Sequence, residues 1–291
     1  MLFMKKLPIQ NDATMNLYHH TRLLVKRKLS FQTPDMTEDG SRTKNDEGRK
    51  PVYLDASPSN DPRFFDLYPA RRGDEVSFTT WQWMWGENKS AANINVCESN
   101  VIYNLEKMPM VKTLVGALES IGCPIKLERH ISCEICTPGT EVQHAGGYDE
   151  VNNQVFICAN TCKNSGYVHG ALVRGLLQMF DRCATNVNFK NVDHLACMEI
   201  RKANLAGCNF MSYMSRVDAD LSVKQEHSNC VKKVAVENMI KARFVDKDVA
   251  REAVDRVFNK CYSDLEPVGR RIGKWSGMYL MKDERYLFGY K

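Results

Sequence analysis

The chain has 291 residues, of which 43% are hydrophobic and 26% charged, so it can bury a core. No uncharged apolar run reaches the roughly 18 residues of a membrane span, so no transmembrane helix is expected. The net charge of +5 resides in residues 1–30, which carry six Lys or Arg and one Asp, and the neutral remainder predicts no nucleic-acid binding.

Residues 1–90 are predicted to form an N-terminal extension. Its basic arm, residues 1–30, is acid-poor and weakly amphipathic, as in a mitochondrial targeting segment, although a solvated arm has the same composition. The linker that follows, residues 31–75, holds five of the ten prolines and few aliphatic side chains. Such a segment buries little apolar surface, so alone it should be disordered or extended.

Residues 76–90 are rich in tryptophan. Trp81, Trp83 and Trp85 alternate strictly, which places three indoles on one face of a strand-like segment. They are expected either to pack on the body of the chain or to bind a partner, because tryptophan is enriched at binding hot spots.

Residues 91–291 hold all eleven cysteines and most of the periodic structure. Hydrophobic spacing predicts two helices, then a small sheet, then more helices, which is an α+β arrangement that is mostly helical. The expected helices are 93–107, 111–120, 168–184, 192–206, 228–242 and 247–263. The expected strands are 125–131, 141–148 and 154–158.

The cysteines leave three interpretations open. Their wide spread favours disulfides between separate elements, which need an oxidising compartment. Cys133, Cys136, Cys158 and Cys162 also have a spacing compatible with a four-sulfur zinc site. Free thiols are the third possibility, since unpaired cysteines are often small buried hydrophobes.

Five stretches carry a family resemblance: 128–136 (ERHISCEIC), 146–149 (GGYD), 180–183 (FDRC), 194–208 (HLACMEIRKANLAGC) and 266–270 (EPVGR). Through them the chain from about Cys97 to Arg270 resembles the mitochondrial inner membrane metalloprotease family of the intermembrane space. That family matures the proton-channel subunit a of ATP synthase and helps to assemble the rotor complex. The resemblance implies a zincin-like fold over residues 91–291, while residues 1–90 match nothing in the family.

The resemblance also bears on the cysteines. Ten of the eleven fall at places that match the family, and they imply five disulfides formed in the intermembrane space, which makes the four-sulfur zinc site less favoured. Cys162 is the additional cysteine. The ten are Cys97, Cys123, Cys133, Cys136, Cys158, Cys183, Cys197, Cys208, Cys230 and Cys261.

The chain departs from the family at its metal motif. The family has His-Glu-x-x-His, in which two imidazoles one helical turn apart bind zinc and the glutamate acts as the general base. Here the three positions are Arg174, Gly175 and Gln178. Guanidinium has no lone pair to donate to a metal, glycine has no side chain, and an amide is a weak zinc ligand.

Three residues near the motif match family positions: Asp181, His194 and Glu199. His194 or Glu199 could have served the zinc site of an active relative, or each can be a buried, hydrogen-bonded structural residue. Asp181 is expected to form an ion pair with Arg174 or Arg182 in the place of a metal.

The sequence therefore predicts a proteolytically inactive protein, not an enzyme, with no cofactor. It is expected to be a structural subunit or assembly factor of an inner-membrane complex, with ATP synthase as the first candidate. It should lie at the intermembrane-space face of the inner membrane, peripheral to the bilayer, with protein subunits of the complex as its partners. The alternatives are a free intermembrane-space chaperone, a residual metalloendopeptidase, and a scaffold of another assembly such as the mitoribosome.

Overall fold

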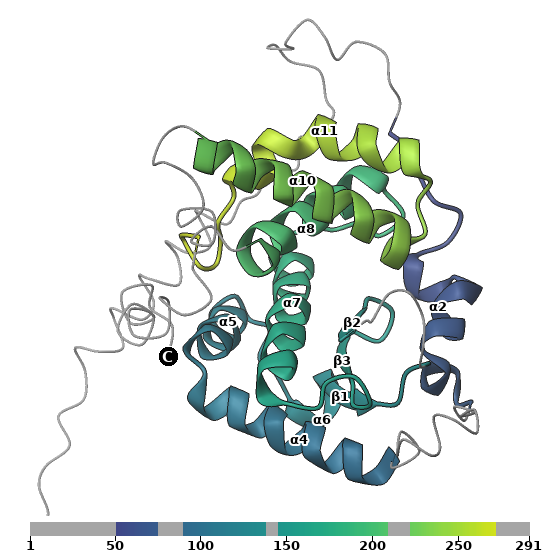
Figure 1. Ribbon diagram of the computed structural model, residues 1–291, viewed down its shortest axis with the longest axis vertical. Helices are drawn as coiled ribbons and strands as arrows, with labels where there is room; N and C mark the ends of the chain where they lie inside the picture. The colour runs from purple at the N-terminus through teal and green to yellow at the C-terminus, as the bar shows by residue number, and fades with distance from the viewer. Residues whose placement is uncertain (1–50, 75–89, 138–144, 209–221, 272–291) are drawn as a thin grey trace, which may run out of the picture. The chain divides into compact units, whose positions relative to one another are not determined.

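The computed structural model describes residues 51–74, 90–137, 145–208 and 222–271 (Figure 1). The expectations for the basic arm and for Trp81, Trp83 and Trp85 lie outside these residues. None of the described helices is both long and apolar enough to cross a membrane.

A three-stranded sheet lies at the centre of the predicted domain. It consists of β1 (Ile131–Glu134), β2 (Gly146–Asp149) and β3 (Gln154–Cys158), in the order β1-β3-β2. The middle strand β3 is parallel to β1 and antiparallel to β2. Because side chains alternate along a strand, Val155 and Ile157 point to one face of the sheet and Phe156 to the other.

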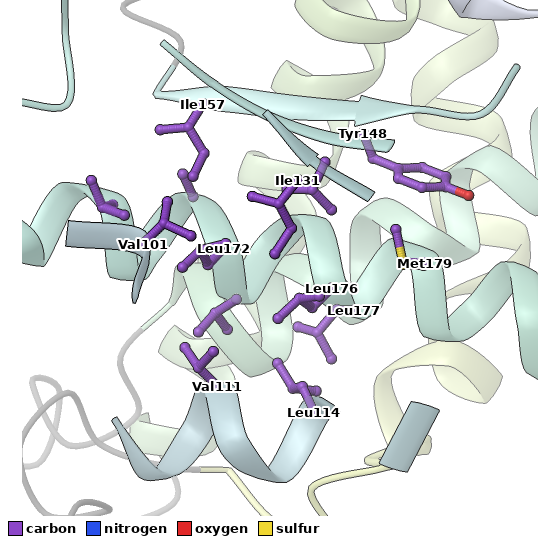
Figure 2. Close-up of a cluster of buried hydrophobic side chains, with 14 of the residues drawn as sticks. Val101, Val111, Leu114, Ile131, Tyr148, Ile157, Leu172, Leu176, Leu177 and Met179 are labelled. Atoms are coloured by element: carbon purple, nitrogen blue, oxygen red, sulfur yellow. The ribbon is translucent and has the colours of Figure 1, made fainter. Parts of the chain in front are cut away.

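Helix α7 (Ser165–Ala184) packs on the Val155 face of the sheet, where strand and helix side chains share one core (Figure 2). Helices α4 (Ser90–Lys107) and α5 (Pro109–Ser120) pack against α7, with α5 on the side away from the sheet. Figure 2 shows Ile131 and Ile157 of the sheet pointing toward α7, with Val111 and Leu114 of α5 on its other side. Helix α7 is therefore surrounded by apolar packing along most of its length.

A second apolar cluster belongs to the later helices. It is built by α8 (Val192–Lys202), the π-helical turn η3 (Ala203–Gly207), α10 (Ser222–Arg243) and α11 (Lys247–Ser263). Helix α8 contacts both α10 and α11, which lie side by side in Figure 1. Since α8 also contacts α7, this helix joins the two clusters.

Residues 51–74 cover the other face of the sheet. The segment contains η1 (Pro58–Asn60), α2 (Pro62–Leu67) and η2 (Pro69–Arg72). Phe64 and Tyr68 pack edge-on against Phe156, with ring centroids 5.9 and 4.5 Å from it. The expectation of a disordered or extended segment is wrong here, because the chain's own sheet offers the apolar surface that the segment lacks alone. The division of the chain at residue 90 stays a prediction.

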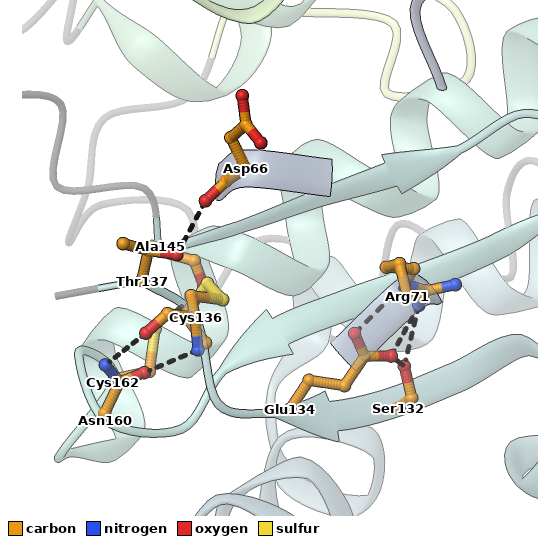
Figure 3. The surroundings of a disulfide bond; sticks show 10 residues. Asp66, Arg71, Ser132, Glu134, Cys136, Thr137, Ala145, Asn160 and Cys162 are labelled. Carbon is orange, nitrogen blue, oxygen red and sulfur yellow. Dashed lines mark hydrogen bonds and ion pairs between the residues drawn. A yellow bond between two sulfur atoms is a disulfide. The ribbon is translucent and has the colours of Figure 1, made fainter. Parts of the chain in front are cut away.

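Arg71 fixes the end of this segment. Its guanidinium forms ion pairs with Glu134 at 2.7 Å and with Asp149 at 3.0 Å, and its side chain is only 5% exposed. It also lies over the ring of Phe156. Figure 3 shows Arg71 above the strand that carries Ser132 and Glu134. Both carboxylates are thus paired with the same residue of the N-terminal segment.

The α+β, mostly helical fold predicted from the sequence is confirmed, while its zincin-like character stays a prediction. The helix expected over 247–263 and the strand expected over 154–158 have the bounds of α11 and β3. The strand expected over 125–131 is wrong, because residues 127–130 form the helical turn α6 (Leu127–His130) and β1 begins at Ile131. Backbone amides of Arg129 and His130 donate to the carbonyl of Lys126, which closes this turn.

The ten matching cysteines form five disulfides, as expected. The pairs are Cys97–Cys133, Cys123–Cys183, Cys136–Cys158, Cys197–Cys261 and Cys208–Cys230. The four-sulfur zinc site is wrong, because three of its four sulfurs are in disulfides. Cys162 is a buried free thiol that donates to the carbonyl of Ala145 at 3.0 Å (Figure 3).

Candidate functional site on helix α7

The start of α7 is set by a side-chain cap. The Asn164 side-chain oxygen accepts hydrogen bonds from the backbone amides of Gly166 at 3.0 Å and Tyr167 at 3.2 Å. This cap satisfies amides that have no partner within the helix. It begins the helix nine residues before Arg174, so the three motif positions fall in its middle.

Gly175 lies directly against the sheet. A Cβ built on Gly175 would lie 2.4 Å from Cγ1 and 2.9 Å from Cγ2 of Val155 on β3. Real Cβ atoms essentially never approach other atoms this closely, so a side chain at position 175 would require Val155 or the helix to shift.

Gln178 points to a buried carboxylate on α8. Its amide nitrogen donates to Glu199 Oε1 at 3.3 Å, and Glu199 is fully buried. The Lys202 ammonium forms an ion pair with Oε2 of Glu199, and Arg243 Nε donates to Oε1 at 3.1 Å. Burial alone raises the pKa of Glu199, but Lys202 and Arg243 outweigh it and hold the pKa below its ordinary value.

The charged cluster continues to the N-terminal segment. Arg243 also faces Glu150, with Nη1 3.8 Å from Oε2. Glu150 accepts hydrogen bonds from the Ser59 backbone amide at 2.7 Å and from its hydroxyl at 2.5 Å. Burial lowers the pKa of Lys202 to about 8 in spite of Glu199 beside it. These contacts connect η1, α8 and α10 around one buried set of charges.

Arg174 lies beside this cluster and is partly exposed. Its guanidinium folds back over the preceding turn, where a Cβ on Gly170 would lie 3.2 Å from Nη1. Burial is the main influence on it and lowers its pKa, while Cys162 and Glu199 raise the pKa from a longer range. None of the carboxylates in the described ranges forms an ion pair with it.

The residues at the motif positions do not fit a zinc ion. Arg174 brings a permanent positive charge, and the one carboxylate beside Gln178 is already held by two cations. Within the described residues, no group of three His, Cys, Asp or Glu has a geometry that could hold a metal.

One of the three matching residues, Asp181, has a different partner from the expected one. Asp181 pairs with Arg201 of α8, whose Nη2 is 2.9 Å from Oδ1, so the expected pair with Arg174 or Arg182 is wrong. Arg182 instead donates to the Tyr148 hydroxyl at 3.3 Å. Asp181 and Arg182 are neighbours in sequence but point to different partners, which sequence spacing alone does not reveal.

His194 takes no part in this cluster. Its Nδ1 accepts a hydrogen bond from the Asn188 backbone amide at 3.0 Å, which secures the turn before α8. Burial lowers the pKa of His194, and Lys260 acts in the same direction, while Asp193 opposes them.

Sequence reasoning missed three members of the charged cluster: Glu150, Lys202 and Arg243. Lys202 follows Glu199 by three residues, which is a recognisable helical ion-pair spacing. Arg243 is 44 residues from Glu199, and no local pattern signals that contact.

The model of the peptidase M76 family matches residues 95–269 of the chain. The chain belongs to this family. The match covers most of the domain predicted over residues 91–291, including α7 and the five disulfides. No solved structure is similar enough to count as a match.

Curated relatives agree with this assignment. The mitochondrial inner membrane protease ATP23 homolog of Homo sapiens is 36% identical over 176 residues, which are 60% of this chain and 69% of that protein. The homolog of Danio rerio is 31% identical over 241 residues, 81% of this chain and 90% of that protein. The fungal protease ATP23 of Coccidioides immitis is 30% identical over 176 residues, 59% of this chain and 70% of that protein.

These matches confirm the family resemblance and the mitochondrial location, and they overturn one prediction. The prediction that the chain is not an enzyme is wrong, because the family is one of peptidases and these relatives are named proteases. Three substituted positions were too narrow a basis against a match over residues 95–269. The Danio rerio match is also longer than residues 91–291, so it extends into the N-terminal extension, where no similarity was expected.

Proposed function

We propose that this peptidase-family protein acts at the mitochondrial inner membrane by binding protein subunits of an inner-membrane complex, ATP synthase first, as a structural subunit or assembly factor. The names of the relatives support a location at the inner membrane. The family resemblance supports a role in the assembly of ATP synthase.

The contact of Gly175 with Val155 is the observation that carries this proposal. The centre of α7 is built into the packing of the sheet, and Gln178 is bound to the interior carboxylate of Glu199. Binding of other subunits at the surfaces of the domain is compatible with such a rigid helix.

The five disulfides support the intermembrane-space side of the membrane. Disulfides persist in oxidising compartments, whereas a matrix protein such as a mitoribosome scaffold would keep its cysteines reduced. All ten matching cysteines are paired here.

The test is the size of the native protein in solubilised mitochondria. The tagged full chain is expected to migrate with ATP synthase or one of its assembly intermediates, and depletion of the chain should reduce the assembled complex. Re-expression of the wild-type chain should restore it. Migration at the size of the single 33.3 kDa chain, with normal complex levels after depletion, would contradict the proposal.

A second candidate is metalloendopeptidase activity, which the names of the relatives favour. The purified, oxidised full chain would be incubated with the precursor of ATP synthase subunit a, with and without a chelator. Cleavage that the chelator abolishes, and that is absent from a mock preparation lacking the chain, would support this candidate. No cleavage by a correctly folded preparation would count against it.

A further inference from the structure

Arg243, at the end of α10, lies between two buried carboxylates. Its Nε donates to Glu199 Oε1 at 3.1 Å, while its Nη1 is 3.8 Å from Oε2 of Glu150. The first distance is that of a hydrogen bond, and the second is too long for one. None of the three side chains is more than 7% exposed. The guanidinium is therefore bound to Glu199, and Glu150 needs other hydrogen-bond donors to compensate its burial.

The N-terminal segment supplies these donors. The Ser59 backbone amide donates to Glu150 Oε1 at 2.7 Å, and the Ser59 hydroxyl donates to Oε2 at 2.5 Å. Both oxygens of the carboxylate are thus held by η1. On the other side of the cluster, Gln178 of α7 donates to the same oxygen of Glu199 as Arg243 does. A continuous set of polar contacts therefore connects the N-terminal segment with the middle of α7.

A second contact of the N-terminal segment holds the same end of α10. The guanidinium of Arg63 on α2 lies over the ring of Phe244, 4.5 Å from its centroid. Phe244 directly follows Arg243 and has a left-handed backbone with φ of 57°, which is rare for a bulky residue. Such a conformation persists only where the surrounding contacts hold it. The segment thus fixes both the backbone that carries Arg243 and the carboxylate that Arg243 faces.

We propose that the N-terminal segment, residues 51–74, is a conformational control element that decides which carboxylate Arg243 binds. While the segment is docked on the sheet, Ser59 holds Glu150 and Arg243 stays on Glu199. Arg243 has two available partners, so a change at one end of the set of contacts can be transmitted to the other.

Release of the segment shifts this balance. Glu150 loses two hydrogen bonds, which is costly for a carboxylate beneath the surface. The guanidinium of Arg243 then moves to it across the present 3.8 Å, because a charge-assisted pair is the strongest available replacement. Glu199 is left with Lys202 and Gln178. A partner that captures the N-terminal segment therefore alters the surroundings of α7 without contacting this helix. Neither of the two functions proposed above is needed for this coupling.

Hydrogen exchange measured by mass spectrometry on the purified, oxidised full chain tests the coupling from the segment to α7. Ser59→Ala removes the hydroxyl donor and keeps the backbone donor. Amide exchange should rise about threefold or more in α7 and α8 as well as in the segment, while α5 stays unchanged as the internal reference for global unfolding. Ser57→Ala is the matched control, because the Ser57 side chain makes no capping hydrogen bond. A rise confined to the segment, or an equal rise in α5, would overturn the proposal.

Glu150→Gln tests whether the effect passes through Arg243. The amide oxygen can still accept a hydrogen bond from Ser59, but the uncharged side chain no longer attracts the guanidinium. In this background Ser59→Ala should leave the exchange of α7 unchanged. Faster exchange of α7 in the double variant than in Glu150→Gln alone would mean that the contact of Glu150 with Arg243 does not carry the effect.

The coupling must also act in the reverse direction, because linkage between two sites is reciprocal. Glu199→Gln frees Arg243 for Glu150, which then depends less on Ser59, so limited proteolysis should cleave the N-terminal segment about threefold faster or more. Lys202→Met has the opposite effect. It removes the other cation from Glu199, which then holds Arg243 more firmly, so cleavage within the segment should be slower than in the wild type.

The two variants form a matched pair, because each removes one member of the same ion pair. A general loss of stability would accelerate cleavage in both, whereas the proposal requires opposite signs. Cleavage of the segment in Lys202→Met at the wild-type rate or faster would overturn the proposal.

Discussion

Gly175 on α7 lies against Val155 on β3, so close that a Cβ on the glycine would lie 2.4 Å from Cγ1 of the valine. In an ordinary helix interior, alanine is about 1 kcal/mol more favourable than glycine. At position 175 we expect alanine to be less favourable than glycine. Gly175→Ala should destabilise the protein by about 1–3 kcal/mol, because the added methyl overpacks the helix–strand contact. The measurement is the midpoint of urea unfolding with the disulfides intact.

The same helix offers a matched control. A Cβ on Gly170 would meet only the flexible end of the Arg174 side chain, at 3.2 Å, so Gly170→Ala should be neutral or stabilising. Val155→Ala combined with Gly175→Ala should cost less than the sum of the single changes, since the smaller strand residue makes room. Equal destabilisation by both glycine substitutions would show that the strand contact is not the cause.

This contact also decides whether a metal site can be rebuilt. The triple variant Arg174→His, Gly175→Glu and Gln178→His restores the family motif but drives a side chain into Val155. We expect no stoichiometric zinc in this variant, as measured by metal analysis after dialysis. Stoichiometric zinc in the folded triple variant would mean that α7 can move away from the sheet.

Glu199 is expected to be among the most sensitive positions of the molecule. It is fully buried and holds Lys202, Arg243 and Gln178. Glu199→Gln leaves the buried Lys202 without a carboxylate and Arg243 with only its longer contact to Glu150 at 3.8 Å. Removing one member of a buried ion pair in this way costs about 3–5 kcal/mol. The measurement is thermal unfolding of the oxidised protein.

A second variant keeps this prediction testable if the first does not fold. Glu199→Gln combined with Lys202→Met also removes the cation that the first change leaves without a carboxylate, so it should recover part of the lost stability. If Glu199→Gln unfolds at the wild-type temperature, water rather than the carboxylate stabilises the two cations.

The sequence predicted those parts of the molecule that are fixed by local patterns. The periodic apolar residues of 247–263, such as Val254 and Phe258, define one face of a helix, and α11 has the expected bounds. Position 175 was recognised as a glycine within a helix, but its neighbour Val155 is twenty residues away on a strand. Contacts of this kind depend on how elements pack, which the local pattern does not contain.

The N-terminal segment shows the same limit. Its prolines and charges predict disorder, and yet residues 51–74 are ordered by Phe156 and by two carboxylates on the sheet. Composition measures what a segment can bury by itself, not what surface another part of the chain offers.

Arg71 should hold this segment on the sheet. Arg71→Ala leaves Glu134 and the buried Asp149 facing each other without a cation, so residues 51–74 should detach more readily. Limited proteolysis is expected to cleave within this segment faster than in the wild type. Arg72→Ala, at a residue whose side chain is 57% exposed in its pair with Asp74, is the control and should change cleavage little. Equal cleavage rates for both variants would show that the aromatic contacts alone hold the segment.

His194 should make the stability of the protein depend on pH. Its Nδ1 accepts the Asn188 amide proton at 3.0 Å, which requires the neutral ring, and burial lowers its pKa from the ordinary value of 6.5. The unfolded chain therefore binds this proton more readily than the folded protein. The stability that the neutral ring contributes is complete above pH 6.5 and is lost as the pH falls through 6.5 toward the lowered pKa.

His194→Asn isolates this contribution, because the asparagine side-chain oxygen can accept the same amide hydrogen bond and does not titrate. The urea concentration at the unfolding midpoint should decrease from pH 8 to pH 5, and this decrease should be smaller for the variant than for the wild type. His130 and His227 also have pKa values lowered by burial, so they add a pH dependence of the same sign to both proteins. The contribution of His194 is therefore the difference between the wild type and the variant in how far the midpoint decreases from pH 8 to pH 5. Identical falls in both would mean that His194 is solvated in the native protein and that its hydrogen bond does not need the neutral ring.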